Sequence, residues 1–374
     1  MTKEDVKKQL IEDYNNKGLV LCIGAGVTAQ YVGTWTELLN KLFQERYIDR
    51  YLSKGNKLDN YSYKYFKSLK IKSPNDLSPT ELAEYLLLDE NDASSDLTSE
   101  LFRIEWREYY LASQIQRHLP EIDEHVIKIA NEYNPQENTL DAVLTLCLSN
   151  RDKHNAIHHL ITYNYDTLIE NCLADKSYKQ KASPSAAPKI IVYSKKEDFE
   201  SPPAINTDDV LNIYHVHGTL VRNSSPAPVI FSESSYDLLS DQQYAWANQI
   251  QAELYMRYPL LFIGFSGHDP NFRRLIKALQ RGGSIHDSYI FMNEAEIIDK
   301  MLPPAKCKKK KTLWQHALDV IKESIEYYYV TVYKLHIIWY SHYPEISKML
   351  MDLANANSIA LKQVSETLSE PHNA

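Results

Sequence analysis

The sequence has few cysteines and no closely spaced cysteine pair. Its 374 residues contain four cysteines, which are scattered along the chain: Cys22, Cys147, Cys172 and Cys307. Zinc ribbons and disulfide frameworks both depend on cysteines at short, regular spacings. We therefore expect neither of them, no bound metal, and reduced thiols in a cytoplasmic protein.

Long apolar runs and an excess of positive charge are also missing. No stretch approaches the roughly 18 apolar residues that a membrane-spanning helix needs, and the first ten residues lack the apolar core of a signal peptide. The 41 Lys and Arg residues are outnumbered by 49 Asp and Glu residues, for a formal net charge of −8. We expect a soluble protein that contacts no membrane and binds no nucleic acid directly.

Four short polar motifs each follow an apolar run. In chain order they are Gly24-Ala25-Gly26, Thr162-Tyr163-Asn164-Tyr165-Asp166, His215-Val216-His217-Gly218, and Gly264 to Pro270. The apolar runs are typical of buried strands. In open α/β sheets, ligands bind outside the carboxyl ends of such strands. The sequence therefore predicts an α/β fold, a Rossmann-like parallel sheet flanked by helices, whose motifs line one crevice suited to a dinucleotide.

The rest of the chain divides into expected helices, strands and loops. We expect a single domain over residues 1–374, with residues 45–150 as a helical insertion that forms a small module over the cleft. Apolar spacing predicts helices at 2–16, 35–44, 141–147, 167–173, 236–258, 271–280 and 345–354. Further strands are expected at 189–193, 289–292 and 336–340, and residues 175–189 have the composition of a loop. The four lysines Lys308 to Lys311 indicate a solvated loop, or else a contact with a phosphate or a partner.

The glycine turn after the first strand allows two interpretations. Gly24 and Gly26 would let the backbone approach a pyrophosphate at a helix N-terminus. The full Gly-x-Gly-x-x-Gly fingerprint is absent, because Ala29 stands where the third glycine would fall. A turn that binds no ligand is therefore equally consistent with the sequence. Thr28, just after the turn, is a further candidate for contact with a cofactor.

The second motif offers a hydroxyl, an amide and a carboxylate. Thr162, Asn164 and Asp166 alternate along an extended segment, which would place their side chains on one face. Together they could recognise a carboxamide and hold a water molecule. Asp166 is equally suited to cap the helix that follows.

The third and fourth motifs add a histidine and further polar groups. His215 and His217 alternate, so we expect one to face the crevice and the other the packing layer. We interpret His217, which precedes Gly218, as the general base and His215 as a packing residue. Gly264, Ser266, Asp269 and Asn271 suit a ribose, although Asp269-Pro270 is also typical of a helix start.

The ordered set of four motifs resembles the sirtuin-like superfamily, and in particular its bacterial anti-phage defence branch. The resemblance implies NAD as the ligand over roughly residues 19 to 350. It implies that Gly24, Ala25 and Gly26 bind the phosphates, that Asn164 lies beside the nicotinamide ribose, and that Asp166 lies near the carboxamide. It makes His217 the catalytic histidine and places Gly264 and Ser266 near the adenosine ribose.

One departure from the family pattern directs the functional prediction. Protein-deacylating sirtuins carry two Cys-x-x-Cys pairs after the His-Gly, and none follows His217-Gly218 here. The resemblance therefore favours an NAD glycohydrolase that consumes NAD as its substrate, with Asn164 and His217 as catalytic residues. A deacylase or ADP-ribosyl transferase, and a non-catalytic NAD sensor, stay as alternatives. A dehydrogenase is disfavoured, because no acidic residue marks the second strand.

The resemblance also implies regulation by other chains. A cytoplasmic enzyme that destroys NAD must be restrained in its host. We expect a homo-oligomer that depletes NAD as the effector of an anti-phage defence system, together with a hexameric HerA-type ATPase. This expectation rests on the size of the chain and on the family, and on no particular residue.

Overall fold

A computed structural model describes most of the chain outside the region between residues 43 and 110. The described residues are 3–34, 36–42, 80–81, 83, 111–113, 115–117, 119–151, 155–182, 187–200, 210–222, 229–241, 245–283, 285–295 and 311–355.

Seven described strands form one sheet in which every neighbouring pair is parallel. The strand order is β3-β4-β2-β1-β5-β6-β7. The strands are β1 (Val20–Ile23), β2 (His159–Thr162), β3 (Lys189–Tyr193), β4 (Val210–His215), β5 (Leu260–Ile263), β6 (Ser288–Asn293) and β7 (Leu335–Tyr340). All residues of β1, β2 and β5 are buried, as expected for parallel strands covered on both faces.

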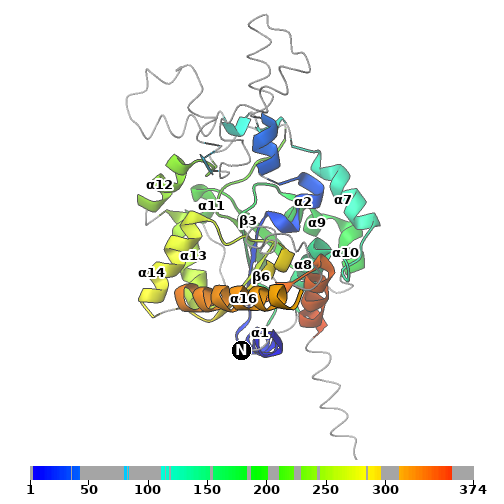
Figure 1. Cartoon of the computed structure of the whole chain (residues 1–374). Helices are drawn as coiled ribbons and strands as arrows, with labels where there is room; N and C mark the ends of the chain where they lie inside the picture. The colour runs from blue at the N-terminus through cyan, green and yellow to red at the C-terminus, as the bar shows by residue number, and fades with distance from the viewer. Residues whose placement is uncertain are drawn as a thin grey trace, which may run out of the picture.

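Helices cover both faces of the sheet and give three layers (Figure 1). One face packs against α1 (Lys3–Lys17), α7 (Ile122–Asn131), α8 (Thr139–Leu148), α9 (Leu168–Ala174), α10 (Lys176–Ala182) and a final helix over residues 343–355. The other face packs against α13 (Trp246–Arg257), α14 (Pro270–Arg281) and α16 (Lys311–Tyr333). The predicted Rossmann-like α/β architecture is confirmed.

Shorter helices connect these layers. They are η1 (Ala25–Val27), α2 (Ala29–Val32), α11 (Lys196–Glu200) and α12 (Glu233–Asp241). None of the described helices is both long enough and apolar enough to cross a membrane.

The strand register brings the four predicted motifs into one row. Ile23 pairs with Thr162 on one side and with Ile263 on the other, and Thr162 pairs in turn with His215. The four strands therefore end side by side in the order β4, β2, β1, β5. The residues that follow these strands therefore meet at the carboxyl edge of the sheet, which is where ligands bind in open α/β folds.

Two of the expected elements differ in the structure. Residues 176–182 form the helix α10 and not a loop, because Asp175 accepts a hydrogen bond from the Tyr178 amide and the Tyr178 side chain is fully buried. The single helix expected over 236–258 is two helices, α12 and α13. Asn248 Nδ2 donates to the Leu239 carbonyl and ties the end of α12 to the start of α13.

Other expectations fall on parts of the chain that are only partly described. Within the proposed insertion 45–150, α7 and α8 belong to the main core, while residues 45–79 and 84–110 lie outside the described residues. The insertion thus stays a prediction. Lys308 to Lys310 also lie outside the described residues, and Lys311 begins α16.

Candidate active site

The glycines of the first and fourth motifs lie against each other. A Cβ atom on Gly24 would come within 2.4 Å of the Gly264 carbonyl oxygen, and one on Gly264 would lie 2.6 Å from the Val27 amide nitrogen. Glycine is therefore required by contact between two backbones at the ends of β1 and β5. This packing accounts for Gly24, Gly26 and Gly264 whether or not a ligand is bound.

The turn after β1 leaves little free backbone for an anion. The amides of Gly24, Gly26, Val27 and Thr28 donate to carbonyl oxygens of the protein itself. The turn leads into η1 and α2, which span three and four residues. The turn is therefore followed by two short helices, ahead of the helix expected at 35–44, and not directly by the N-terminus of a long helix.

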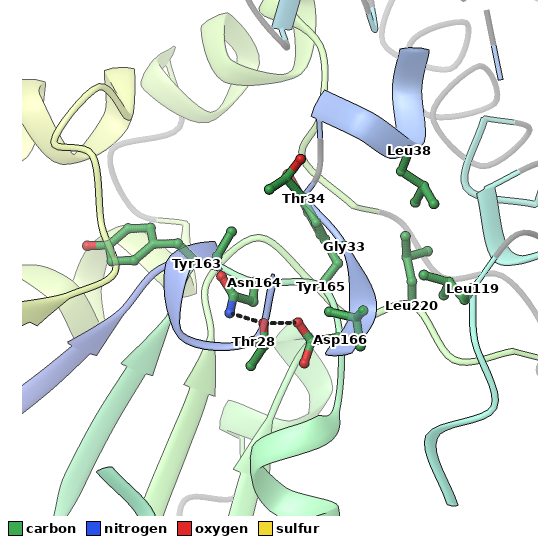
Figure 2. Close-up of a pocket in the computed structure, with 12 residues that line it drawn as sticks. Thr28, Gly33, Thr34, Leu38, Leu119, Tyr163, Asn164, Tyr165, Asp166 and Leu220 are labelled. Atoms are coloured by element: carbon green, nitrogen blue, oxygen red, sulfur yellow. Dashed lines mark hydrogen bonds between the residues drawn. The ribbon is translucent and has the colours of Figure 1, made fainter. Parts of the chain in front are cut away.

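A chain of hydrogen bonds connects the second motif to Thr28. Asn164 Nδ2 donates to Thr28 Oγ1 at 3.1 Å, and Thr28 Oγ1 donates to Asp166 Oδ2 at 2.9 Å. Figure 2 shows the Thr28 hydroxyl between the amide and the carboxylate. Asn164 Nδ2 also donates to the Gly24 carbonyl at 3.3 Å. A carbonyl can only accept, so this contact identifies which atom of the amide is nitrogen.

The other side-chain atom of Asn164 has no such partner. Asn164 is 5% exposed, and its Oδ1 atom is buried without a hydrogen-bond partner among the described residues. Its backbone amide donates to Thr162 Oγ1, and its backbone carbonyl lies 3.3 Å from His215 Nδ1. Native proteins rarely leave a buried acceptor unpaired, so such an atom indicates a site that a ligand or water fills.

Asn164 lies where two cavities meet. The larger cavity, of about 570 Å³, extends across the ends of β1, β5, β6 and β7 and falls in the usual size range of small-molecule sites. The smaller cavity has a volume of about 60 Å³. Both are lined by Ala25, Thr34, Tyr163 and Asn164. A ligand that occupied both would cross from one to the other beside Asn164.

The smaller cavity combines a carboxylate with an apolar wall. Asp166 and Thr28 line one side, and Leu38, Leu119 and Leu220 line another (Figure 2). Burial raises the pKa of Asp166, although hydrogen bonds from the Leu168 amide and from Thr28 oppose the rise. The Leu168 contact also shows that Asp166 caps the start of α9, one of the two roles that its sequence position suggested.

His217 lies outside the described lining of both cavities. It is 3% exposed, and its Nε2 atom is 3.2 Å from Asp269 Oδ2. The rings of Tyr163 and Tyr165, which line the smaller cavity, pack against its imidazole with centroids 5.4 and 6.1 Å away. His217 thus contacts two residues of the cavity lining without lining the cavity itself.

Asp269 has a different position from the one its motif suggested. Its Oδ1 atom accepts from the Phe272 amide and caps α14, and its Oδ2 atom accepts from the Tyr236 hydroxyl at 2.8 Å. Burial acts to raise the pKa of Asp269, but His217 and these hydrogen bonds outweigh it and lower the pKa. The structure therefore joins Asp269 to His217 and leaves it out of the described cavity lining.

The remaining predicted residues divide into two groups. Gly24, Ala25, Gly26, Gly264 and Ser266 all line the larger cavity. Thr162 lines neither cavity, because its hydroxyl accepts from the Asn164 amide. His215 is buried against Glu170 of α9, with Nε2 and Oε1 2.9 Å apart.

No sequence motif indicated the far wall of the larger cavity. Asn293, Ile325, Tyr329, Trp339 and Tyr343 line it, from the ends of β6 and β7, from α16 and from the final helix. Trp339 is held from behind, since its Nε1 atom donates to Glu326 and Lys322 lies 5.2 Å from its ring centroid. Among these residues only Trp339 lies in an element that the sequence predicted, the strand at 336–340, where an apolar residue is explained by packing alone. The helix α16, which carries Ile325 and Tyr329, was not predicted.

Comparison with protein families agrees with this geometry. Residues 158–317 match the family model of the SIR2-like domain. No curated protein gives a significant match to the chain. The match supports placement in the sirtuin-like superfamily and indicates an NAD-related enzyme activity.

The SIR2-like segment covers Asn164, His217 and Gly264 but not the glycine turn at Gly24. The parallel pairing of β1 with β2 and β5 joins that turn to the segment. Across the described parts of the chain, no cluster of three or more His, Cys, Asp or Glu side chains is arranged to hold a metal ion.

Proposed function

We propose that the protein hydrolyses the N-glycosidic bond of NAD and releases nicotinamide and ADP-ribose. The observation that carries this proposal is Asn164 Oδ1, a buried and unpartnered acceptor at the junction of a large and a small cavity. NAD has a matching shape, with a large ADP-ribose part joined to a small nicotinamide ring. The SIR2-like segment independently favours NAD as the ligand.

The two cavities suggest how NAD would lie. The larger cavity, with its aromatic wall and the glycines of two strand ends, would take the ADP-ribose part. The smaller cavity would take the nicotinamide ring, with Asp166 accepting a hydrogen bond from the carboxamide. This arrangement places the bond to be broken beside Asn164.

Asn164 would hold the attacking water through its Oδ1 atom. The water oxygen bonds to C1 of the ribose as the bond to the nicotinamide nitrogen breaks, through an oxocarbenium-like transition state. The bonding electrons neutralise the pyridinium, and one proton of the water is released. An acceptor already oriented before the reaction needs no reorganisation in the transition state, which is a main source of catalysis.

His217 would accept the released proton. Asp269 orients its imidazole, as a carboxylate does for other catalytic histidines. Because His217 lines neither cavity and packs against Tyr163 and Tyr165 of the lining, this role requires one of these rings to shift when NAD binds.

A product assay tests the proposal and separates it from its alternatives. The purified protein, alone and with any protein that co-purifies, is incubated with NAD in the presence and absence of an acetyl-lysine peptide. We expect equal amounts of nicotinamide and ADP-ribose, independent of the peptide. Nicotinamide release that requires the peptide would indicate a deacylase, transfer of ADP-ribose to protein would indicate a transferase, and intact NAD would contradict all three.

The family resemblance also supports a role in anti-phage defence. We propose that the protein depletes NAD in infected cells as part of an oligomer with a hexameric HerA-type ATPase. The test is to express the tagged protein from its native locus and to identify co-purifying chains with and without phage infection. Absence of an ATPase partner in both samples would contradict this part of the proposal.

A further inference from the structure

A buried histidine and a glutamate lie directly behind Asn164. His215 ends β4 and its side chain is 1% exposed, while Glu170 stands in the first turn of α9 with its side chain 13% exposed. His215 Nε2 is 2.9 Å from Glu170 Oε1, and His215 Nδ1 is 3.3 Å from the Asn164 carbonyl oxygen. The pair thus connects the backbone of Asn164 to a second element of the fold.

The two contacts determine how many protons His215 carries. The Asn164 carbonyl can only accept, so Nδ1 must carry a proton. A carboxylate likewise accepts, so a proton on Nε2 satisfies the contact with Glu170 as well. The doubly protonated imidazolium is therefore the form of His215 that satisfies both neighbours at once.

The electrostatic surroundings favour the same form. Burial alone lowers the pKa of His215, but Glu170, the Asn164 carbonyl and Asp166 outweigh it, and the net effect raises the pKa above the usual histidine value. Among the described residues, Glu170 and Asp166 are the charged groups that shift the pKa of His215, and both are acidic.

Asn164 is held at each of its other polar groups. Its side-chain nitrogen contacts Thr28 and Gly24. Its backbone amide contacts Thr162, and its backbone carbonyl contacts His215. Only Oδ1 is left for a ligand. Loss of the carbonyl contact would remove the hydrogen bond that ties the Asn164 backbone to the end of β4.

We propose that His215 and Glu170 form a positioning pair, which fixes the backbone of Asn164 and so aims its Oδ1 atom into the junction of the two cavities. This inference rests on the proposed NAD hydrolysis. Neither residue lines either cavity among the described residues, so the pair acts through Asn164 and not on the substrate.

The test compares Glu170→Gln and His215→Gln with the wild type in nicotinamide release between pH 5.5 and 9. Glu170→Gln removes the negative charge that holds the second proton. At high pH the neutral imidazole can then place its one proton on Nε2, against the amide oxygen, and lose the donor on Nδ1 that contacts the Asn164 carbonyl. We expect its kcat to be near wild type at pH 5.5 and to fall about tenfold or more by pH 8, with KM for NAD within about twofold. His215→Gln should be slow at every pH.

His159→Gln is the matched control. Like His215, His159 is a buried histidine, and its hydrogen-bond partner is Tyr214. It is the first residue of β2, however, so it lies at the other end of that strand from the site. Its substitution should leave the pH profile of kcat unchanged. The positioning role would be overturned if the kcat of Glu170→Gln, relative to wild type, did not vary with pH. It would also be overturned if kcat and KM changed equally.

A second readout separates this inference from the proposed function. Nitrogen-15 NMR of labelled histidines, with His215→Gln for assignment, reports the protonation of His215 directly. If the wild type releases no nicotinamide, hydrolysis is contradicted. A doubly protonated His215 at pH 7 that becomes singly protonated in Glu170→Gln would still support the pair, whereas a singly protonated His215 in the wild type would overturn it.

Discussion

Asn164 carries no charge, and its importance lies in how the fold uses its polar atoms. Thr28 and Gly24 occupy the side-chain nitrogen, and the oxygen is left without a hydrogen-bond partner among the described residues, in a side chain that lines both cavities. The sequence predicted Asn164 as a site residue from its place after a strand. It could not predict the role of Thr28, because the two residues are 136 positions apart and meet only through the pairing of β1 and β2.

Asp166 should impose an acid limit on activity. Its pKa is raised, so it becomes protonated at a higher pH than the usual value of about 3.9 for aspartate. As pH falls through the raised pKa, the carboxylate is lost as an acceptor for the carboxamide. We expect kcat for nicotinamide release to fall on the acid side above pH 4.

Asp166→Asn is the variant that checks this limit. It should lower kcat by about tenfold to a hundredfold at neutral pH and abolish the acid limb. The measurement is kcat from pH 4.5 to 8 for both proteins. An identical acid limb in Asp166→Asn would show that another group is responsible.

At the scale of elements, two turns hold the site together. Gly24 ends β1 and Gly264 ends β5, and their backbones touch. The family resemblance assigned Gly24 to phosphate binding and Gly264 to the adenosine ribose, but their contact explains both glycines through packing alone. A turn motif does not reveal whether glycine is needed for a ligand or for a neighbouring strand.

Gly24→Ala should destabilise the protein through a steric clash. Gly24 has φ −110°, which suits any residue, but the added Cβ would lie 2.4 Å from the Gly264 carbonyl oxygen. We expect a loss of about 3 kcal/mol or more in the free energy of unfolding, because backbone cannot move aside as a side chain can. The measurement is urea unfolding.

Gly283→Ala is the control for this substitution. Gly283 has φ +70° and open space around its Cβ position, so alanine there should cost only about 1 kcal/mol from backbone strain. Equal losses in the two variants would contradict the proposed contact between β1 and β5.

His159, at the start of β2, should make the fold sensitive to acid. Burial lowers its pKa from 6.5 to about 4. Between these values the unfolded chain binds a proton that the folded protein does not, so stability falls as pH drops from about 6.5 to 4. The loss attributable to His159 is about 3 kcal/mol at most. Unfolding of His159→Gln should show a correspondingly smaller decrease over this range; the same slope as wild type would contradict the assignment.

The helices show where sequence reasoning reached its limit. The amphipathic α14 was predicted within one residue at each end, and its capping Asp269 was recognised as a helix start. The helix α10 was missed because its lysines and serine resemble a loop, and a single buried tyrosine holds it. The break between α12 and α13 depends on the contact of Asn248 with Leu239, which no local pattern records.

At the scale of the whole molecule, the parallel sheet gathers motifs that are far apart along the chain. The apolar runs before them predicted the strands and the common edge, because strands covered on both faces are continuously apolar. The sequence did not indicate that Asp269 would contact His217, or that Trp339 and Tyr329 would wall the larger cavity. Those relations depend on the order of strands and the packing of helices across them.

The central claim is that Asn164, aimed by its neighbours, makes this fold an enzyme that hydrolyses NAD. The most direct measurement is kcat for nicotinamide release by the wild type, Asn164→Ala and Thr28→Ser, together with the affinity of each for ADP-ribose. We predict that Asn164→Ala lowers kcat by about a hundredfold to a thousandfold and changes affinity little. Thr28→Ser, which keeps the hydroxyl, should stay near wild type. Nicotinamide release by Asn164→Ala at the wild-type rate would contradict the account.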